Sequence, residues 1–447
     1  MPGIELLDPL LLGAFRFRTR GLLRMEDAAG IVPPAPREGA DYLYLHVPFC
    51  QALCPFCSFH RVPHHPALAR RYFHALRQEV RLYHRAGYRF NGAYFGGGTP
   101  TSEPAELLET VKLVRDLFGL AQISVETNPS DLRTEILEPL RAAGVTRLSV
   151  GVQSFDDRLL REMGRERYGT GDEILQAVHR TAGLFPTLNL DLIFNLPHQT
   201  LDSLKRDLNL VRESGANQVS TYPLMGSPST QRQMAGTMGL PDRRRMAAFY
   251  RAVLAGLQPD FTPSSGWCFN RGGRGTDEYV IDADHYVGVG SGAFSYLNGT
   301  LYSTSFSLRA YEQQISEGLS GIVSQHHLGK GDQMRYTLLL RLFGLGLDRA
   351  WAVRRHGPGF FRTVWGELLT LEWLGAARKD ARGWRPTERG LYWLVLMMSA
   401  FYESVNGYRE TMRAHVQEEL QELEGGCARP HAAVYGATPT AVLDVPK

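Results

Sequence analysis

The chain has 447 residues, a length that fits one large domain with appended segments or two to three domains. Hydrophobic residues make up 43% of it and charged residues 21%, which indicates an ordinary globular protein. The formal net charge is only +3, so the charge balance gives no reason to expect a nucleic-acid partner.

Residues 1–41 come before the first clear strand pattern. They lack the cationic start, the clean apolar run and the small-residue cleavage site of a signal peptide, so we expect a cytoplasmic protein. Their last part, IVPPAPREGAD, is rich in proline and has the composition of a linker. We interpret this segment as an N-terminal arm or lid.

Residues 42–260 alternate between strand and helix patterns. Amphipathic stretches, several of which end at glycine, separate short stretches with a strand period. Short links between successive βα units indicate a parallel sheet. We therefore predict an α/β fold, a partial (β/α)6 barrel of the TIM type, with six strands at 42–47, 92–95, 122–126, 147–152, 188–194 and 217–222.

Three of the five cysteines, Cys50, Cys54 and Cys57, lie within eight residues directly after the first predicted strand. A reducing cytoplasm disfavours disulfides, and a structural zinc site usually needs four protein ligands. Three thiolates on a short loop can instead hold three irons of a [4Fe–4S] cluster and leave the fourth iron open for another ligand. His60 or Cys268 could alternatively fill that position.

Other informative residues also follow predicted strands. The stretch 96–101 (GGGTPT) follows the second strand, 126–129 (ETNP) the third and 153–155 (QSF) the fourth, while Asp191 lies in the fifth. The carboxyl ends of barrel strands carry the active site in enzymes of this architecture. Taken singly, each acid could equally be a surface ion-pair member or a helix cap.

With GVQSF and DLIFNLP, these motifs make the chain resemble the radical S-adenosylmethionine (SAM) enzymes of the oxygen-independent coproporphyrinogen III dehydrogenase superfamily, from about residue 42 to 389. The resemblance implies that Cys50, Cys54 and Cys57 hold a catalytic [4Fe–4S] cluster whose open iron SAM chelates. It implies a 5′-deoxyadenosyl radical as the hydrogen-abstracting species, and a low-potential electron donor of the flavodoxin or ferredoxin type. The SAM contacts that it implies are Tyr44, Phe56, Gly97, Gly98, Thr99, Glu126, Gln153, Arg165 and Asp191.

The second half of the chain is less informative. Residues 261–325 resemble the part of the superfamily that closes the site, and Gly290, Gly292 and Ala293 match a small-residue loop that would hold a second SAM; a hairpin corner is the alternative. Cys268 is either a hydrogen donor near the substrate or a small buried residue. The pattern of residues 326–424 predicts a mainly helical, winged C-terminal domain. Its apolar stretch Leu391–Tyr402 is too short to span a membrane. Residues 425–447 have the composition of a disordered tail.

Two features argue against the dehydrogenase itself: Phe59 stands where that enzyme has an extra cysteine, and the arm lacks its tyrosines. We therefore expect the class C methyltransferase and cyclopropanase branch, in which a second SAM supplies carbon to an sp2 carbon of an apolar or aromatic substrate. A partner methyltransferase is a further candidate. The alternatives are oxidative decarboxylation of coproporphyrinogen III and a heme-trafficking role with little SAM cleavage.

Overall fold

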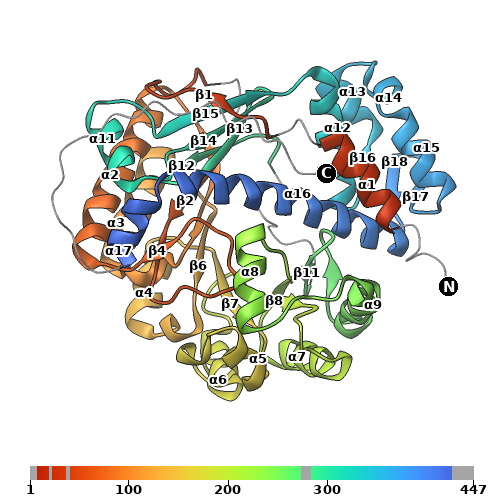
Figure 1. Cartoon of the computed structure of the whole chain (residues 1–447), viewed down its shortest axis with the longest axis horizontal. Helices are drawn as coiled ribbons and strands as arrows, with labels where there is room; N and C mark the ends of the chain where they lie inside the picture. Colours follow the sequence, from red (N-terminus) through yellow and green to blue (C-terminus); the bar gives the residue numbers. More distant parts are fainter. Residues whose placement is uncertain (1–7, 20–22, 37–40, 273–282, 425–447) are drawn as a thin grey trace.

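The computed structural model describes residues 8–19, 23–36, 41–272 and 283–424. Six parallel strands form the centre of its main sheet, in the spatial order β2-β5-β6-β7-β8-β9 (Figure 1). This arrangement confirms the predicted partial (β/α)6 barrel. The strands are β2 Asp41–Val47, β5 Phe90–Gly97, β6 Ile123–Thr127, β7 Arg147–Gln153, β8 Thr187–Phe194 and β9 Gln218–Pro223.

Helices cover the outer face of this sheet, as the amphipathic stretches predict. They begin at local signals: Thr170 and Glu173 form a reciprocal capping box at the start of α6, and Thr200 with Ser203 does the same for α7. The helices between the strands are α2 Pro66–Arg85, α3 Pro104–Phe118, α4 Thr134–Ala142, α5 Asp157–Glu162, α6 Gly171–Thr181 and α7 Leu201–Glu213. After β9 follow α8 Pro228–Thr237 and α9 Met246–Leu257.

The sheet extends beyond the barrel on both sides. Beside β9 lie the antiparallel strands β11 Cys268–Asn270 and β10 Thr262–Pro263; beside β2 lies the parallel strand β12 Tyr286–Val289. Further strands on that side are β13 Phe294–Leu297, β14 Thr300–Thr304, β15 Ile322–His327 and β1 Glu26–Asp27, with α11 Leu308–Ser316 between β14 and β15. The segment expected to close the site is thus largely an extension of the barrel sheet, and the arm supplies its edge strand.

The C-terminal part is mainly helical with a small wing. It comprises α12 Lys330–Phe343, α13 Arg349–His356, α14 Phe360–Thr363, α15 Trp365–Trp373 and the sheet β16 Leu347–Asp348, β18 Gly383–Pro386 and β17 Ala377–Lys379. The helix α16, Glu388–His415, then returns across the molecule to the barrel, and α17, Gln417–Glu424, follows it (Figure 1). Helix α1, Asp8–Thr19, packs along α16. The expected tail lies outside the described residues.

The stretch Leu391–Tyr402 forms the first half of α16, and most of its side chains are buried. This apolar stretch is therefore part of a helix that packs in the core. Among the helices of the described ranges, none is long and apolar enough to cross a membrane.

Candidate active site

The three clustered cysteines lie on the loop between β2 and α2. Cys50 ends the short strand β3, Phe49–Cys50, which pairs with β4, Val62–Pro63; the Cys57 amide closes a turn on the Cys54 carbonyl at 3.2 Å. All three thiols are free. The buried Arg61 donates from Nη2 to the carbonyl oxygens of Cys54, at 2.5 Å, and Cys57, at 2.9 Å. A cation beside the thiols therefore fixes the path of their loop.

A chain of hydrogen bonds joins the two buried thiols from outside that loop. Thr99 Oγ1 lies 3.7 Å from Cys50 Sγ and accepts from Asn128 Nδ2 at 2.7 Å. Arg165 Nη2 donates to Asn128 Oδ1 at 2.9 Å, and Arg165 Nη1 lies 3.6 Å from Cys54 Sγ. The ends of β5 and β6 and the turn before α6 thus meet at the cysteine loop.

Burial raises the pKa of the Cys50 thiol to about 12, and the nearby Cys57 contributes to this rise. A bound metal cation would favour the thiolate form of Cys50. In the described ranges, no three His, Cys, Asp or Glu side chains converge as they would around a single metal ion. Each cysteine of a [4Fe–4S] cluster binds a different iron. Three separated thiols flanked by two arginines fit that group.

Two part-buried carboxylates lie on the barrel strands beside the cysteine loop. Glu126 on β6 accepts a hydrogen bond from the Tyr94 hydroxyl at 2.8 Å, and Asp191 on β8 accepts one from Ser149 at 2.9 Å. Burial raises the pKa of Glu126 to about 7, with the charge of Asp191 adding to the effect, and raises the pKa of Asp191 to about 6. Raised carboxyl pKa values of this kind occur often at functional sites, so the two carboxylates are candidates for contact with polar ligand groups.

Gln153 and Arg165 also occupy the positions that the sequence predicts at this end of the barrel. Gln153 ends β7 with φ of 70°, where the pairing with β8 changes register. A left-handed conformation at a non-glycine residue is a strain found mainly at functional sites. The guanidinium of Arg165 is buried, donates to the Gly151 carbonyl and lies 4.5 Å from the centre of the Tyr168 ring. Phe56 is buried within the cysteine turn.

The glycine run after β5 is packed against protein. A Cβ on Gly98 would lie 2.6 Å from the Phe49 carbonyl oxygen, and one on Gly97, at φ +111°, would meet the His46 ring at 2.6 Å. The Gly97 amide donates to Glu126 Oε2 at 3.1 Å. Glycine is therefore required here for close packing of strand ends. The direct SAM contact stays a prediction.

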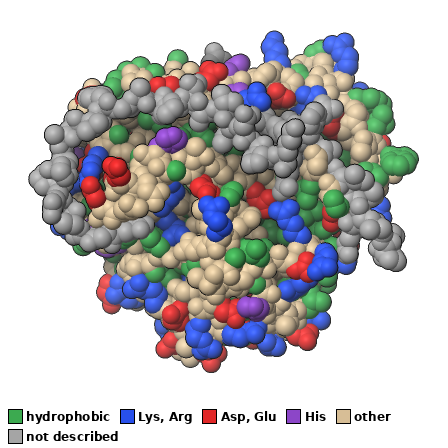
Figure 2. All heavy atoms as spheres, viewed as in Figure 1, with side chains coloured by type: hydrophobic (Ala, Val, Ile, Leu, Met, Phe, Trp, Pro, Cys, Tyr) green, Lys and Arg blue, Asp and Glu red, His purple; other side chains and the backbone are tan. Residues whose placement is uncertain are grey.

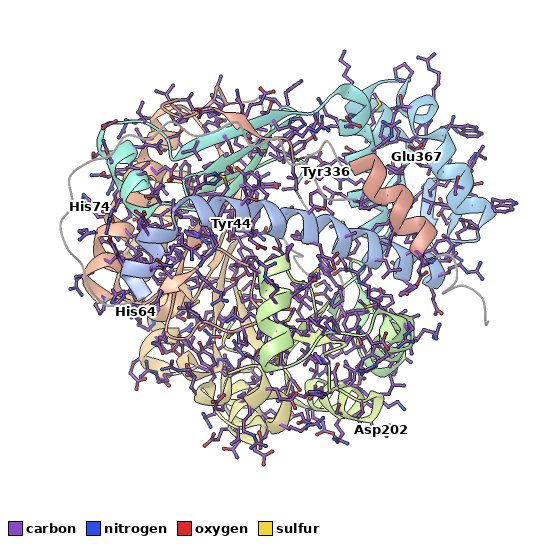
Figure 3. All side chains as sticks on the ribbon, in the orientation of Figure 1. Tyr44, His64, His74, Asp202, Tyr336 and Glu367 are labelled. Atoms are coloured by element: carbon purple, nitrogen blue, oxygen red, sulfur yellow. The ribbon has the colours of Figure 1, made fainter. Side chains whose placement is uncertain are left out.

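Tyr44 lies at the centre of the molecule beneath α16 (Figure 3) and belongs to a second hydrogen-bonded chain. Its hydroxyl is 2.9 Å from His46 Nδ1, and His46 Nε2 is 2.8 Å from the His60 carbonyl oxygen. Nε2 must carry a proton to donate to that carbonyl. Because burial lowers the pKa of His46 to about 4, Nδ1 is unprotonated near neutral pH and accepts from the Tyr44 hydroxyl. His60 Nε2 contacts Ser291 at 3.1 Å, and Arg413 Nη1 lies 3.3 Å from Nδ1. Both His60 nitrogens thus have protein partners, which leaves neither available to the cluster.

The predicted second-SAM loop packs tightly behind this chain. The Gly290 amide donates to Glu79 at 2.8 Å, the Gly292 amide to the Ser305 carbonyl at 2.9 Å and the Ala293 amide to Thr304 at 2.8 Å. A Cβ on Gly292 would lie 2.6 Å from the His60 ring. The small residues therefore let this corner approach the cluster strand. Their role toward a second SAM stays a prediction.

The C-terminal half of α16 covers the mouth of the barrel beside the cysteine loop. Arg413 donates to the Arg61 carbonyl at 2.9 Å, and the Arg409 guanidinium stacks on Phe59 at 4.9 Å and on Phe294 at 5.4 Å. Arg409, Arg413, Arg61 and His46 were not predicted as site residues, and Asn128 was noted only as part of the stretch 126–129. No local motif marks these arginines, because they reach the site only through the fold.

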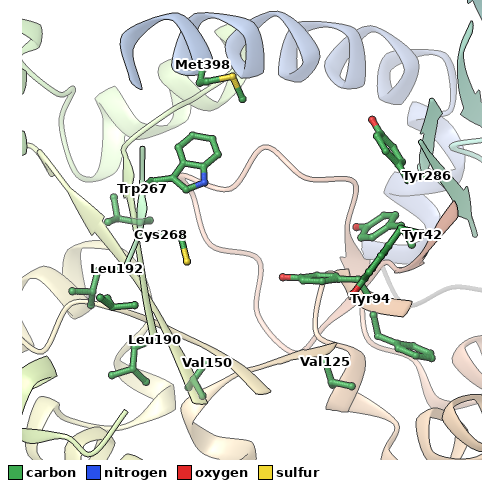
Figure 4. Close-up of a cluster of buried hydrophobic side chains, with 14 of the residues drawn as sticks. Tyr42, Tyr94, Val125, Val150, Leu190, Leu192, Trp267, Cys268, Tyr286 and Met398 are labelled. Carbon is green, nitrogen blue, oxygen red and sulfur yellow. The ribbon is translucent and has the colours of Figure 1, made fainter. Parts of the chain in front are cut away.

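Inside the barrel, Arg147 lies below the carboxylates. Its Nε donates to Gln218 Oε1 at 2.7 Å, and Gln218 Nε2 donates to Asn270 Oδ1 at 2.7 Å. Figure 4 shows Cys268 and Tyr94 on opposite sides of the same interior. Cys268 is buried on β11, opposite Ser220 of β9. The thiol therefore belongs to the barrel wall, apart from the cysteine loop.

Comparison with known proteins agrees with this geometry. Residues 44–211 match the model of the radical SAM superfamily. The chain is 30% identical over 353 residues to the heme chaperone HemW of Lactococcus lactis, covering 73% of this chain and 88% of that protein. It is 28% identical over 389 residues to the oxygen-independent coproporphyrinogen III oxidase of Escherichia coli, covering 78% and 82%.

The fold comparison points the same way. The Escherichia coli coproporphyrinogen III oxidase structure aligns with a TM-score of 0.69 and 24% identity, covering 82% of this chain and 91% of that one. At this identity the match establishes the fold. Neither these relatives nor this structure supports methylation or cyclopropanation, the reaction expected from the sequence; a heme chaperone and a coproporphyrinogen III oxidase instead correspond to the two alternatives.

Proposed function

Because the chain belongs to the radical SAM superfamily and, within it, to the HemN- and HemW-like family, it uses a [4Fe–4S] cluster and SAM, and we propose that its substrate is a carboxylate-bearing tetrapyrrole. The proposed reaction is oxidative decarboxylation: the 5′-deoxyadenosyl radical would take one hydrogen atom from the carbon chain that carries the carboxylate, and the resulting substrate radical would lose CO2, pass one electron to an external one-electron acceptor and keep a carbon–carbon double bond. This replaces the expected carbon transfer from a second SAM.

The residues present fit the cofactors. Cys50, Cys54 and Cys57 would hold three irons, while Arg61 and Arg165 offset the charge of the thiolates and fix their loop. When bound and reduced, the cluster with SAM supplies one-electron bond cleavage and hydrogen abstraction. The protein's own task is to orient the ligands and to keep water from the barrel mouth.

The observation that carries the substrate class is Arg147. It is 2% exposed, and its Nη1 has no hydrogen-bond partner among the described residues. A buried donor without a partner costs about 1–3 kcal/mol, and more when it is charged. Asn270 Nδ2 and Trp267 Nε1 likewise have no partner within the described ranges. A substrate carboxylate inside the barrel would satisfy the guanidinium and accept from a neighbouring donor.

The covering helix supports the same function. Arg413 and Arg409 close the mouth above the cysteine loop, and the apolar part of α16 reaches Trp267 on the barrel side, where its Tyr402 ring lies 5.7 Å away. Aromatic side chains such as Trp267 and Tyr402 suit contact with a flat ring system, while the buried arginine supplies charge recognition. A tetrapyrrole with acidic side chains has both the flat ring system and the negative charge that these residues would recognise.

The test is anaerobic reconstitution with iron and sulfide and reduction of the cluster, followed by incubation with SAM, coproporphyrinogen III and a one-electron acceptor. Mass spectrometry should show 5′-deoxyadenosine together with a tetrapyrrole that has lost carboxyl groups as CO2. If coproporphyrinogen III does not stimulate the formation of 5′-deoxyadenosine and is not itself consumed, it is rejected as the substrate. Formation of S-adenosylhomocysteine with a heavier tetrapyrrole would restore the carbon-transfer hypothesis.

Heme trafficking is a second candidate, favoured by the HemW relatives, which align over nearly their whole length. Phe59 and the Arg409 guanidinium that stacks on it lie at the mouth, where a flat anionic ring could rest. Titration of the reconstituted protein with hemin distinguishes the two. Stoichiometric heme binding without 5′-deoxyadenosine production would support the second candidate.

A further inference from the structure

An apolar face on the C-terminal domain has no role in the site described above. Trp365, Leu369 and Trp373 of α15 are 50%, 44% and 84% exposed. Their spacing of four residues places them along one side of the helix. We call these three residues the α15 face. They make up three of the seven large hydrophobic residues that are exposed in the described part of the chain.

The other side of α15 faces the interior of the C-terminal domain. Leu368 is fully buried, Glu367 accepts from Arg335 Nε at 2.9 Å, and Glu372 accepts from Trp384 Nε1. Figure 3 shows Glu367 on the C-terminal domain beside α12. Both acids of the helix are therefore used internally, and the outward side is left apolar.

The surroundings of the α15 face are basic. Residues 349–389 hold nine Lys and Arg against four Asp and Glu, a net charge of +5 in a chain whose total is +3. Arg362 on α14 and Arg378 on β17 are exposed, and Arg389 donates to the Leu374 carbonyl at the end of α15 at 2.7 Å. Exposed tryptophan next to cations is the composition of surfaces that lie in the headgroup region of anionic bilayers.

The size and shape of the face favour a bilayer over a protein partner. A tryptophan side chain covers about 150–250 Å2, so these partly exposed residues offer on the order of 400 Å2, about half of the ~800 Å2 per partner in a stable protein interface. Helix α15 lies at the outer edge of the molecule (Figure 1), and hydrophobic side chains protrude there (Figure 2). We propose that the α15 face docks this protein onto membranes that contain anionic lipid.

The test is cosedimentation of the reconstituted full chain with vesicles, anaerobically. Vesicles of phosphatidylcholine with phosphatidylglycerol should bind the protein and shift its tryptophan emission to the blue, and pure phosphatidylcholine vesicles should bind much less. The double variant W365S/W373S should lose at least about tenfold in binding. Arg378→Glu should also weaken binding, and added salt should weaken it for the unchanged protein.

Matched controls distinguish vesicle binding through the α15 face from nonspecific binding by other exposed side chains. Leu240→Ser removes an apolar side chain that is 51% exposed elsewhere, and Arg161→Glu reverses an exposed charge on α5; both should bind vesicles as the unchanged protein does. Unchanged binding by W365S/W373S, or no binding to anionic vesicles, would overturn the proposal. A dimer that W373S dissociates, without vesicle binding, would instead assign the face to self-association.

Discussion

Arg165 and Thr99 are joined through the side chain of Asn128, which donates to Thr99 at 2.7 Å and accepts from Arg165 at 2.9 Å. The outer ends of this bridge lie 3.6–3.7 Å from the sulfurs of Cys54 and Cys50. A single amide therefore sets the position of two groups that contact the thiols. Outer partners of this kind orient metal ligands and tune the electrons of the metal.

Replacing Asn128 with leucine should leave the three thiols in place but free Thr99 and Arg165 to move. We expect the variant to take up iron and to form 5′-deoxyadenosine about 10- to 100-fold more slowly. Iron content and the rate of SAM cleavage measure the two effects separately. Ser130→Ala, which removes a part-buried hydroxyl bonded only locally to Asp131, is the control. A rate for Asn128→Leu equal to that control would show that the bridge is dispensable.

Cys54→Ala should abolish both the cluster and SAM cleavage, because a cluster iron loses its protein ligand. Cys268→Ala should keep the iron content and the visible absorption of the unchanged protein, since this thiol lies in the barrel wall. Anaerobic iron determination with absorption spectra distinguishes the variants. Loss of iron in Cys268→Ala would mean that this thiol reaches the cluster after all.

Arg147→Met should weaken the use of a carboxylate-bearing substrate. Removing a charged hydrogen bond costs about 1.5–3 kcal/mol, so kcat/KM should fall roughly 10- to 100-fold. SAM cleavage in the absence of substrate should be measured beside kcat/KM, because the charge of Arg147 also acts on Asp191 and Glu126; a loss confined to the substrate-dependent reaction is the expected result. Arg147→Lys should recover part of the loss by keeping the charge. If Arg147→Met has the same kcat/KM as the unchanged protein, Arg147 does not take part in substrate recognition.

Gly98→Ala tests whether the glycine run is needed for packing as well as for SAM. The new Cβ would lie 2.6 Å from the Phe49 carbonyl, so the metal-free protein should melt several degrees lower, as a strained site costing ~1–3 kcal/mol predicts. Gly236→Ala on α8, where nothing lies within 4 Å, should melt at the original temperature or slightly higher. An unchanged melting temperature combined with weaker SAM binding would assign the run to the cofactor alone.

Asp207 should make stability depend on pH. Burial raises its pKa from 3.8 to about 7, although Ser154 and Phe155 donate to it. The folded state therefore keeps a proton that the unfolded state releases, and the free energy of unfolding should fall as pH rises from about 4 to 7, by at most about 4 kcal/mol.

Denaturant unfolding of Asp207→Asn over the same pH range measures this contribution. The variant should show a smaller decline, because residue 207 no longer titrates, while Glu126 and Asp191 retain theirs. Asp202→Asn, on the exposed side of the same helix, should keep the original slope. An identical slope in Asp207→Asn would show that the carboxyl of Asp207 titrates normally.

The α/β order and the place of the catalytic loop could be predicted from sequence, because both are local properties. A strand period of two and a helix period of 3.6 are readable within single segments, and parallel strands bring their carboxyl ends to one edge. Cys50, Glu126 and Gln153 each follow or end a strand, and they do meet at that edge. The three thiols, their motif and the family could therefore be identified without coordinates.

Only the tertiary structure decided what surrounds those thiols. Arg413 reaches His60 across most of the chain, and Asn128 bridges two other elements; such pairings leave no periodic trace in the sequence. For the glycines near residue 290, only the structure shows that a Cβ would fall on the His46 carbonyl and the His60 ring, while their role toward a second SAM stays a prediction. Ligand-binding motifs and the periods of helices and strands can be recognised from the order of residues. Close packing between distant segments exists only after the chain has folded.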